Sequence, residues 1–372
     1  MTNEPGRPQS DSEAATASVD AHQRVDNAVS AAIGRFHVQH GVVRMIVLTV
    51  VAFAIFAIAR PTIFLNPLNL QNIAIAAPEI GLLALAIMLA MLTGGIDLSV
   101  VAIANMTAIT ISVLSTEFGE SAGPGVVLLI VLAGLLVGLA GGLLNGLLVA
   151  KVGITPILAT LGTMQILNGL ALVWTGGKTL YGAPQALTTF GQTAVAGVPA
   201  LFVVLVLVAV VLAVVINRTA LGSSILLQGA NPVAARFSGI RTERTLMLTY
   251  LLSSALAAVA GILFVSRNPT ASADYGSSYV LLVIVIAVLG GTNPNGGFGT
   301  VLGVVLATLT LQIVSSGFNI LRLTSYDYAI AQGAILIVVM VLDQITTRRR
   351  RSAVPKSPKS TMNVPLQGLR KS

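Results

Sequence analysis

Seven acidic or amide side chains interrupt long apolar stretches of the chain, and these are the residues that could do chemistry. Carboxylates accept hydrogen bonds and amides both accept and donate them, so together they could line a path for a neutral, polyhydroxylated solute. Polar residues in apolar, membrane-type helices are costly and mark functional sites by default. Amides, however, also hold such helices together, and an acid in the position of Asp97 is more often a helix cap or loop ligand than a substrate contact. The seven candidates are Glu79, Asp97, Asn105, Asn145, Gln165, Asn168 and Gln312.

Enzyme chemistry has little support in the sequence. The chain has no Cys, and its 3 His lie at or before position 40, which excludes Cys catalysis and a Ser–His pair in the apolar part. The GKT tripeptide at 177–179 has the ending of a nucleotide-binding GxxxxGK[ST] loop, but Leu172 replaces the leading Gly. We therefore expect no catalytic residue, metal site or bound cofactor in this chain.

The elements that must position the seven side chains are membrane-spanning helices. Hydrophobic residues make up 55% of the 372 residues and charged residues only 9%, whereas soluble proteins carry about 25% charged residues. A helix needs about 20 apolar residues to cross a bilayer, and the apolar runs lack the alternation of a barrel strand. We predict an all-α polytopic membrane protein with ten segments, at about 42–59, 72–92, 98–116, 125–150, 153–175, 198–216, 245–266, 279–291, 298–318 and 326–345. The eighth is short enough to be a half-helix or a re-entrant segment.

The basic residues predict the orientation, because cytoplasmic loops are enriched in Lys and Arg. With both termini in the cytoplasm, seventeen of the 21 Lys and Arg residues fall on that side. Residues 1–40 and 347–372 hold eleven basic and five acidic residues, which is +6 of the net +8, so the basic character belongs mostly to the tails and no nucleic-acid partner is expected. We predict a disordered cytoplasmic tail at 1–40, a transmembrane domain at 41–346 and a basic cytoplasmic tail at 347–372, in the inner membrane.

The longest predicted cytoplasmic loop, 217–244, contains a short capped helix. Asn231 can cap its start, Pro232 is a favoured first residue, and Gly239 can end it. The residues between form one or two amphipathic turns. Such a helix suits docking into a groove on a partner protein or resting on lipid headgroups.

Glycine-rich sequences mark close contacts and interruptions. The sequence GLAGGLLNG at 138–146 predicts a close approach of two helix backbones. GGID at 94–97 and GGTN at 290–293 each interrupt an apolar run near the predicted cytoplasmic side. Interrupted helices in the two halves of a chain are typical of repeated transporter architectures.

Four motifs occur in a characteristic order along residues 45–345: LTGGIDLSV (92–100), NGLLVAKVGITPILATLGT (145–163), LLQGANPVAARFSGI (226–240) and AVLGGTNPNGGFGTVLG (287–303). Together they resemble the ribose-type permeases of bacterial ABC importers, within the branched-chain amino-acid and ribose permease superfamily. WTGGK at 174–178 is similar to the autoinducer and rhamnose branch. The chain departs from the family pattern at Val233, where an acid is common, and at Val101, where Gly is usual.

The resemblance implies a permease subunit that forms the translocation path for a sugar or sugar-like solute. ATP and Mg would then be bound by a separate cytosolic ABC ATPase subunit, and this chain would itself catalyse no reaction. The other implied partners are a second permease subunit, identical or homologous, and an extracytoplasmic solute-binding protein. The residues that match the family's ATPase-coupling segment are Gly229, Asn231, Ala234, Ala235, Arg236, Ser238 and Gly239.

Two other functions stay open on the sequence alone. Branched-chain amino-acid permeases share the superfamily, although the sparse charge favours a neutral solute over a zwitterion. An ion-coupled secondary transporter would need a titratable carboxylate inside a span, and Glu79 is the acid that lies well inside one.

Overall fold

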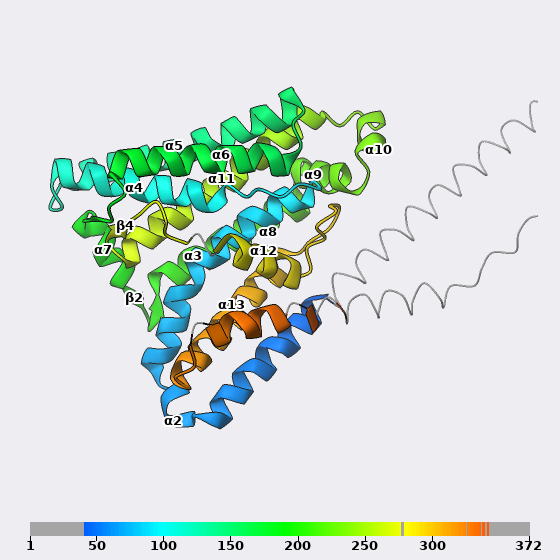
Figure 1. Cartoon of the computed structure of the whole chain (residues 1–372). Coiled ribbons are helices and arrows are strands. Elements are labelled where there is room, and N and C mark those ends of the chain that lie inside the picture. Colours follow the sequence, from blue (N-terminus) through cyan, green and yellow to red (C-terminus); the bar gives the residue numbers. More distant parts are fainter. Residues whose placement is uncertain (1–40, 277–278, 325, 336, 339–340, 342–372) are drawn as a thin grey trace, which may run out of the picture. The chain divides into compact units, whose positions relative to one another are not determined.

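The computed structural model describes residues 41–276, 279–324, 326–335, 337–338 and 341. The chain forms two compact units, Met1–Tyr328 and Ala329–Ser372. The described residues of the second unit are helical, and the elements discussed below belong to the first (Figure 1). The predicted tails at 1–40 and 347–372 lie outside the described residues.

Within the described residues, 8 helices are long and apolar enough to cross a membrane. They confirm the all-α class and eight of the ten predicted segments. The tenth predicted segment, 326–345, is described only in part and is helical at 326–335. The eight helices are Gly41–Ala59, α3 (Pro67–Leu92), α4 (Val100–Phe118), α5 (Pro124–Leu147) continued by the π-helix η1 (Leu148–Val152), α6 (Pro156–Thr175), α8 (Ala200–Arg218), α11 (Thr242–Arg267) and α13 (Val301–Ile320).

Local sequence explains several helix starts. The helices α3, α5 and α6 each begin on a proline. Proline has no N–H, and this is no loss at the first position of a helix, because an N–H there has no acceptor within the helix. Shorter elements lie between the long helices. These are α2 (Pro61–Phe64), α7 (Gln185–Gln192), α9 (Ala220–Ala230), α10 (Pro232–Phe237), α12 (Tyr279–Leu289) and the strands β1 (Leu180–Tyr181), β2 (Ala194–Val195), β3 (Val198–Pro199) and β4 (Thr270–Ala271).

The helix α11 packs against α3, α4 and α5 at the core of the bundle. Glycines of α5 allow the approach, because a Cβ atom on Gly142 would lie 1.9 Å from Ser254 Oγ and one on Gly138 would lie 2.6 Å from Ala258 Cβ. The predicted close approach at 138–146 is confirmed, and small residues are what permit it. Most of α3 is buried by its neighbours, which makes it a helix that can present side chains to the interior.

The loops gather at two opposite ends of the bundle. Figure 1 shows α9 and α10 at one end, which we call the α10 end, and α7 with β4 at the other, which we call the β4 end. At the α10 end, Gly297 N donates to Leu92 O over 3.0 Å, which joins the two interrupted regions. At the β4 end, Gly182 N donates to Pro269 O over 3.0 Å. The loops predicted for one side of the membrane thus share one end of the fold.

The chain folds back into the bundle after α11, in a stretch that we call the re-entrant segment (268–276). It starts at the β4 end, where β4 pairs antiparallel with β1. It then turns inward, and Asn105 Nδ2 of α4 donates to the carbonyl oxygens of Ala273 and Tyr275 over 3.0 and 2.8 Å. Two main-chain carbonyls are therefore held inside the bundle by one amide.

The helix α12 follows the re-entrant segment and has only 11 residues. At 1.5 Å per residue it is about 16 Å long, roughly half of a hydrocarbon core of about 30 Å. The eighth predicted segment is therefore a half-helix preceded by a re-entrant segment, as its short length indicated.

Candidate functional site

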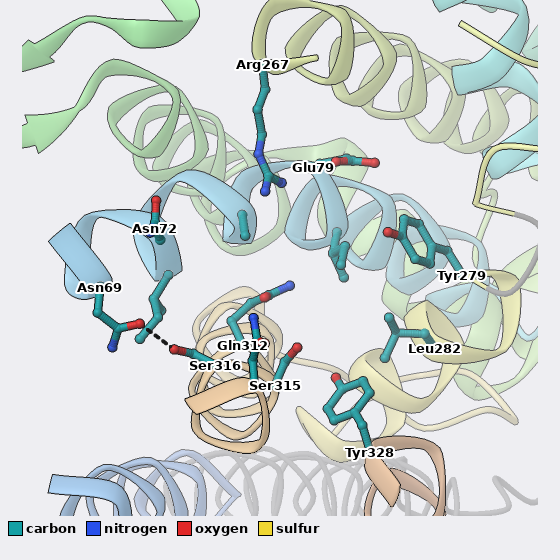
Figure 2. Close-up of a pocket in the computed structure, with 14 residues that line it drawn as sticks. Asn69, Asn72, Glu79, Arg267, Tyr279, Leu282, Gln312, Ser315, Ser316 and Tyr328 are labelled. Atoms are coloured by element: carbon teal, nitrogen blue, oxygen red, sulfur yellow. Dashed lines mark hydrogen bonds between the residues drawn. The ribbon is translucent and has the colours of Figure 1, made fainter. Parts of the chain in front are cut away.

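A polar cavity of about 360 Å³ lies between α3, α12, α13 and the end of α11 (Figure 2). Two of the seven predicted pathway residues, Glu79 and Gln312, line it. Its walls combine amides and hydroxyls with one carboxylate and one guanidinium, so they offer both donors and acceptors. The polar lining residues are Asn69, Asn72, Glu79, Arg267, Tyr279, Gln312, Ser315, Ser316, Asn319 and Tyr328.

Most of these side chains come from two helix faces. Residues three, four and seven positions apart share a face of a helix. Asn69, Asn72 and Glu79 follow this spacing on α3, and positions 312, 315, 316 and 319 follow it on α13. The sequence contains this signal, but the candidates chosen from it were Glu79 and Gln312 alone.

Some of the polar side chains that line the cavity already have hydrogen-bond partners in the protein. Ser316 Oγ donates to Asn69 Oδ1 over 2.7 Å and so links α13 to α3 (Figure 2), while Asn69 Nδ2 donates to Phe64 O over 2.8 Å. Within the described part of the chain, no hydrogen bond engages the other amide groups of the cavity. Those groups are available to a bound solute, and they are Asn72, Gln312 and Asn319.

The Glu79 carboxylate lies at the inner side of the cavity and is only 5% exposed. Tyr275 Oη, from the re-entrant segment, donates to Glu79 Oε1 over 2.7 Å. The Tyr275 ring stacks on Phe264, with ring centroids 3.6 Å apart. Sequence reasoning missed Tyr275, because its partner is 196 positions away and no local pattern places a tyrosine in a non-helical segment beside α3.

A second cavity, of about 220 Å³, lies on the other side of the re-entrant segment. Asn105 and Asn168, two further predicted pathway residues, line it together with Met164 and Ala273. The side chain of Asn105 therefore both holds the re-entrant segment and lines this cavity. Four of the seven predicted residues line one of these two cavities.

Asp97 belongs to a fully buried network and lines neither cavity. Its Oδ1 accepts from Ser99 N over 3.0 Å and from Ser99 Oγ over 2.6 Å, and its Oδ2 accepts from Ser253 Oγ over 3.1 Å. Asn145 Nδ2 donates to Ser99 Oγ over 2.7 Å. Burial raises the pKa of Asp97, and the hydrogen bonds from Ser99 and Ser253 oppose that rise. Asp97 is thus a hydrogen-bond acceptor within the loop before α4, whose N-cap, Ser99, makes no side-chain cap bond, and Asn145 ties α5 to that loop.

Gln165 lies apart from both cavities. Its side chain is exposed on the outer face of α6, among Leu161 and Ile166, which are also exposed. A membrane or a second subunit can cover such a face. Its pathway role stays a prediction.

The predicted capped helix is present as α10. Asn231 Oδ1 accepts from Val233 N and Ala234 N over 3.1 and 3.0 Å, Pro232 is the first residue, and Gly239 ends the turn with φ of +80°. The helix α9, which precedes α10, was not expected within 217–244.

Only one side chain of the candidate coupling segment anchors α10 to the bundle. Ala235 is 3% exposed, whereas Val233 is 65% exposed and Phe237 is 89% exposed. Arg236 is exposed beside them. An aromatic and an aliphatic side chain four positions apart form an apolar strip on one helix face, and it points away from the protein.

The fold and the cavity together define a class of protein. A bundle of apolar helices with a broken helix, a polar cavity between its helices and an exposed apolar helix at one end is the architecture of a membrane transport subunit. The chain belongs to the family described as branched-chain amino acid transport system, permease component, whose model matches residues 69–340.

Several curated proteins are similar to this chain over most of its length. The ribose import permease protein RbsC of Bacillus subtilis (strain 168) is 35% identical over 292 residues, which cover 78% of this chain and 88% of that protein. The L-arabinose transport system permease protein AraH of Escherichia coli (strain K12) is 31% identical over 323 residues, 87% of this chain and 95% of that protein. The autoinducer 2 import system permease protein LsrD of Photorhabdus temperata is 31% identical over 314 residues, 82% of this chain and 91% of that protein. No solved structure matches the chain.

The family and the fold confirm the predicted general class. The chain is a multi-pass inner-membrane permease subunit of an ABC importer, a transport component whose ATP hydrolysis takes place on a separate subunit. The resemblance to ribose-type permeases is likewise confirmed. A secondary transporter driven through Glu79 does not fit this family.

Proposed function

We propose that this chain forms the translocation path for a neutral sugar or sugar-like solute. The observation that carries the proposal is its similarity, over 78% and 87% of its length, to permeases for ribose and L-arabinose. The polar cavity supports it independently, because three amide groups without partners in the described chain and several hydroxyls can exchange hydrogen bonds with a polyhydroxylated solute. Glu79 and Gln312 in this cavity, and Asn105 and Asn168 in the second, are the pathway residues that we favour.

A branched-chain amino acid is a second candidate solute. The family description names this class, and Glu79 and Arg267 face the same cavity (Figure 2). An acid and a base in one cavity could pair with the ammonium and carboxylate groups of a zwitterion. The neutral solute remains our choice, since an aliphatic side chain would leave the cavity amides without partners.

We also propose the assembly that surrounds the chain. Its partners would be a cytosolic ABC ATPase that binds ATP and Mg, a second permease subunit, identical or homologous, and an extracytoplasmic solute-binding protein. The α10 end would face the cytoplasm, since Lys151, Arg218, Arg236, Arg241 and Arg244 belong to the loops at this end. Both termini, with the tails 1–40 and 347–372, would then be cytoplasmic, flanking the transmembrane domain 41–346.

In this assembly α10 would be the contact with the ATPase. The backbone at the two ends of this segment depends on Gly229, Asn231 and Gly239. The helix has small side chains at Ala234 and Ala235, and the apolar strip is bordered by Arg236 and Ser238. An exposed aromatic side chain is the kind of residue that dominates binding energy when it enters a pocket on a partner. Closure of the ATPase dimer on ATP would press on α10 and shift the bundle.

A mild-detergent purification of the whole chain with its membrane complex tests this proposal. We expect an ATP-hydrolysing subunit to co-purify with the wild-type chain. We expect it to be lost with Phe237→Asp, because the new carboxylate would be buried in an apolar contact without a partner. Tyr181→Asp is the matched control, since Tyr181 is an aromatic side chain 73% exposed at the β4 end. A chain that purifies without any ATPase, or equal ATPase recovery with both variants, would contradict the proposal.

A further inference from the structure

A small void around two tyrosines borders both cavities of the chain. The void, of about 10 Å³, shares Glu79 and Tyr279 with the polar cavity. It shares Val101 and Asn105 with the second cavity. We call Tyr275 and Tyr279, whose rings meet edge to face with centroids 5.7 Å apart, the tyrosine wall. The wall stands between two spaces that are each large enough for several water molecules.

The tyrosine wall is held by few contacts. The hydroxyl of Tyr275 is bound to Glu79, its carbonyl to Asn105, and its ring to Phe264. The residue lies in a turn, where its N–H donates to Ser272 O over a long 3.4 Å. A group that competes for the Glu79 carboxylate would therefore remove the bond that ties the side chain of Tyr275 to α3.

We propose that the polar cavity is a solute-binding site, and that in the unliganded chain Tyr275 occupies the solute's place on Glu79. The ligand is a neutral solute with one ring and several hydroxyl groups. On binding, one of its hydroxyls donates to Glu79 in place of the Tyr275 phenol, and the tyrosine wall opens toward the second cavity. The inference rests on the proposed function, since it assigns a site to that solute.

The chemistry of the exchange is balanced. One O–H donor to a carboxylate replaces another of the same kind, so the buried acceptor is never left without a partner. The amide of Asn72 on α3, the Arg267 guanidinium at the end of α11 and the amide of Gln312 on α13 also line the cavity and can meet the remaining hydroxyls (Figure 2). A volume of about 360 Å³ falls in the usual range for small-molecule sites, about 300–1,000 Å³.

The absence of cysteine in the chain makes a direct test possible. Gln312→Cys places one thiol in the polar cavity of the full chain, in membranes that contain its ATPase, where a charged, membrane-impermeant thiosulfonate is applied from the outer side. We expect labelling, and we expect D-ribose or L-arabinose at tens of millimolar to slow it severalfold, while L-leucine has no effect. Thr189→Cys, at an exposed position of α7, is the control that should be labelled at one rate under all conditions.

A second variant tests the exchange at Glu79. Val101→Cys lies beyond the tyrosine wall, and we expect slow labelling from the outer side that rises severalfold when Tyr275→Phe is added. Phenylalanine keeps the ring on Phe264 and removes only the hydroxyl that binds Glu79. Equal labelling of Val101→Cys with tyrosine and with phenylalanine at 275 would overturn the exchange.

The two proposals can fail separately. If the ATPase co-purifies but Gln312→Cys is unreachable, or is protected by L-leucine and by neither pentose, the site assigned here is wrong and the importer class stands. If no ATPase co-purifies, the proposed assembly fails whatever the labelling shows.

Discussion

Replacing Gly229 with valine is expected to disrupt the α10 end and abolish import. A Cβ atom at Gly229 would lie 1.9 Å from Leu92 O and 2.5 Å from Gly297 N, and these are backbone atoms that cannot rotate away. The same two groups form the hydrogen bond that joins α3 to the loop before α13. Overpacking a core contact costs about 1–3 kcal/mol and occasionally more, and here the clash with backbone atoms would separate α9 from the bundle.

The measurement is the unfolding temperature of the detergent-purified chain together with uptake by the assembled importer. Gly162→Val is the matched control, because Gly162 lies in the interior of α6 and a Cβ atom there meets nothing within 4 Å. We expect a large loss of thermal stability for Gly229→Val and little change for the control. Equal stability of the two variants would show that the close approach at Gly229 relaxes without cost.

The sequence predicted best those features that depend on neighbours along the chain. Hydropathy located the long helices because each needs about 20 apolar residues in a row. The cap at Asn231 and the turn at Gly239 were correct because these hydrogen bonds form within four residues. The half-helix at α12 followed from its length, although the sequence left open whether it was a half-helix or a re-entrant segment.

The site was predicted only in part, because long-range contacts decide which polar side chains meet. Glu79 and Gln312 share a cavity since α3 and α13 pack together, and no spacing within either helix shows that. The bond between Tyr275 and Glu79 needs a segment that leaves the bundle and returns. A search for polar residues at helical spacing would have added Asn72 and Asn319 to the candidates, but it would not have found Tyr275.

Replacing Asp97 with leucine is expected to destabilise the whole bundle more than any change in the cavities. Asp97 is 0% exposed, and its loss would leave Ser99 N and Ser99 Oγ buried without the acceptor that they share. Two orphaned buried donors cost roughly 2–6 kcal/mol together. The hydrogen bond from Asn145 to Ser99 Oγ would also weaken, since Asp97 no longer fixes the orientation of the Ser99 hydroxyl. A fall in the unfolding temperature and in the amount of folded protein recovered from membranes is the expected result.

The variant Asp97→Asn separates hydrogen bonding from charge. Its Oδ1 can still accept from Ser99, and its Nδ2 can donate to Ser253 Oγ, whose own proton then goes to Ala86 O, 3.1 Å away. Ser99 and Ser253 keep their partners, so we expect a much smaller loss than with leucine. Burial raises the pKa of Asp97 in the folded chain, so this group contributes stability below the ordinary carboxyl pKa that is lost as pH rises through the raised value. Asparagine removes this contribution, so the unfolding temperature of Asp97→Asn should fall less between acid and neutral pH than that of the wild-type chain. An unchanged slope would mean that the Asp97 carboxyl keeps the same pKa on folding.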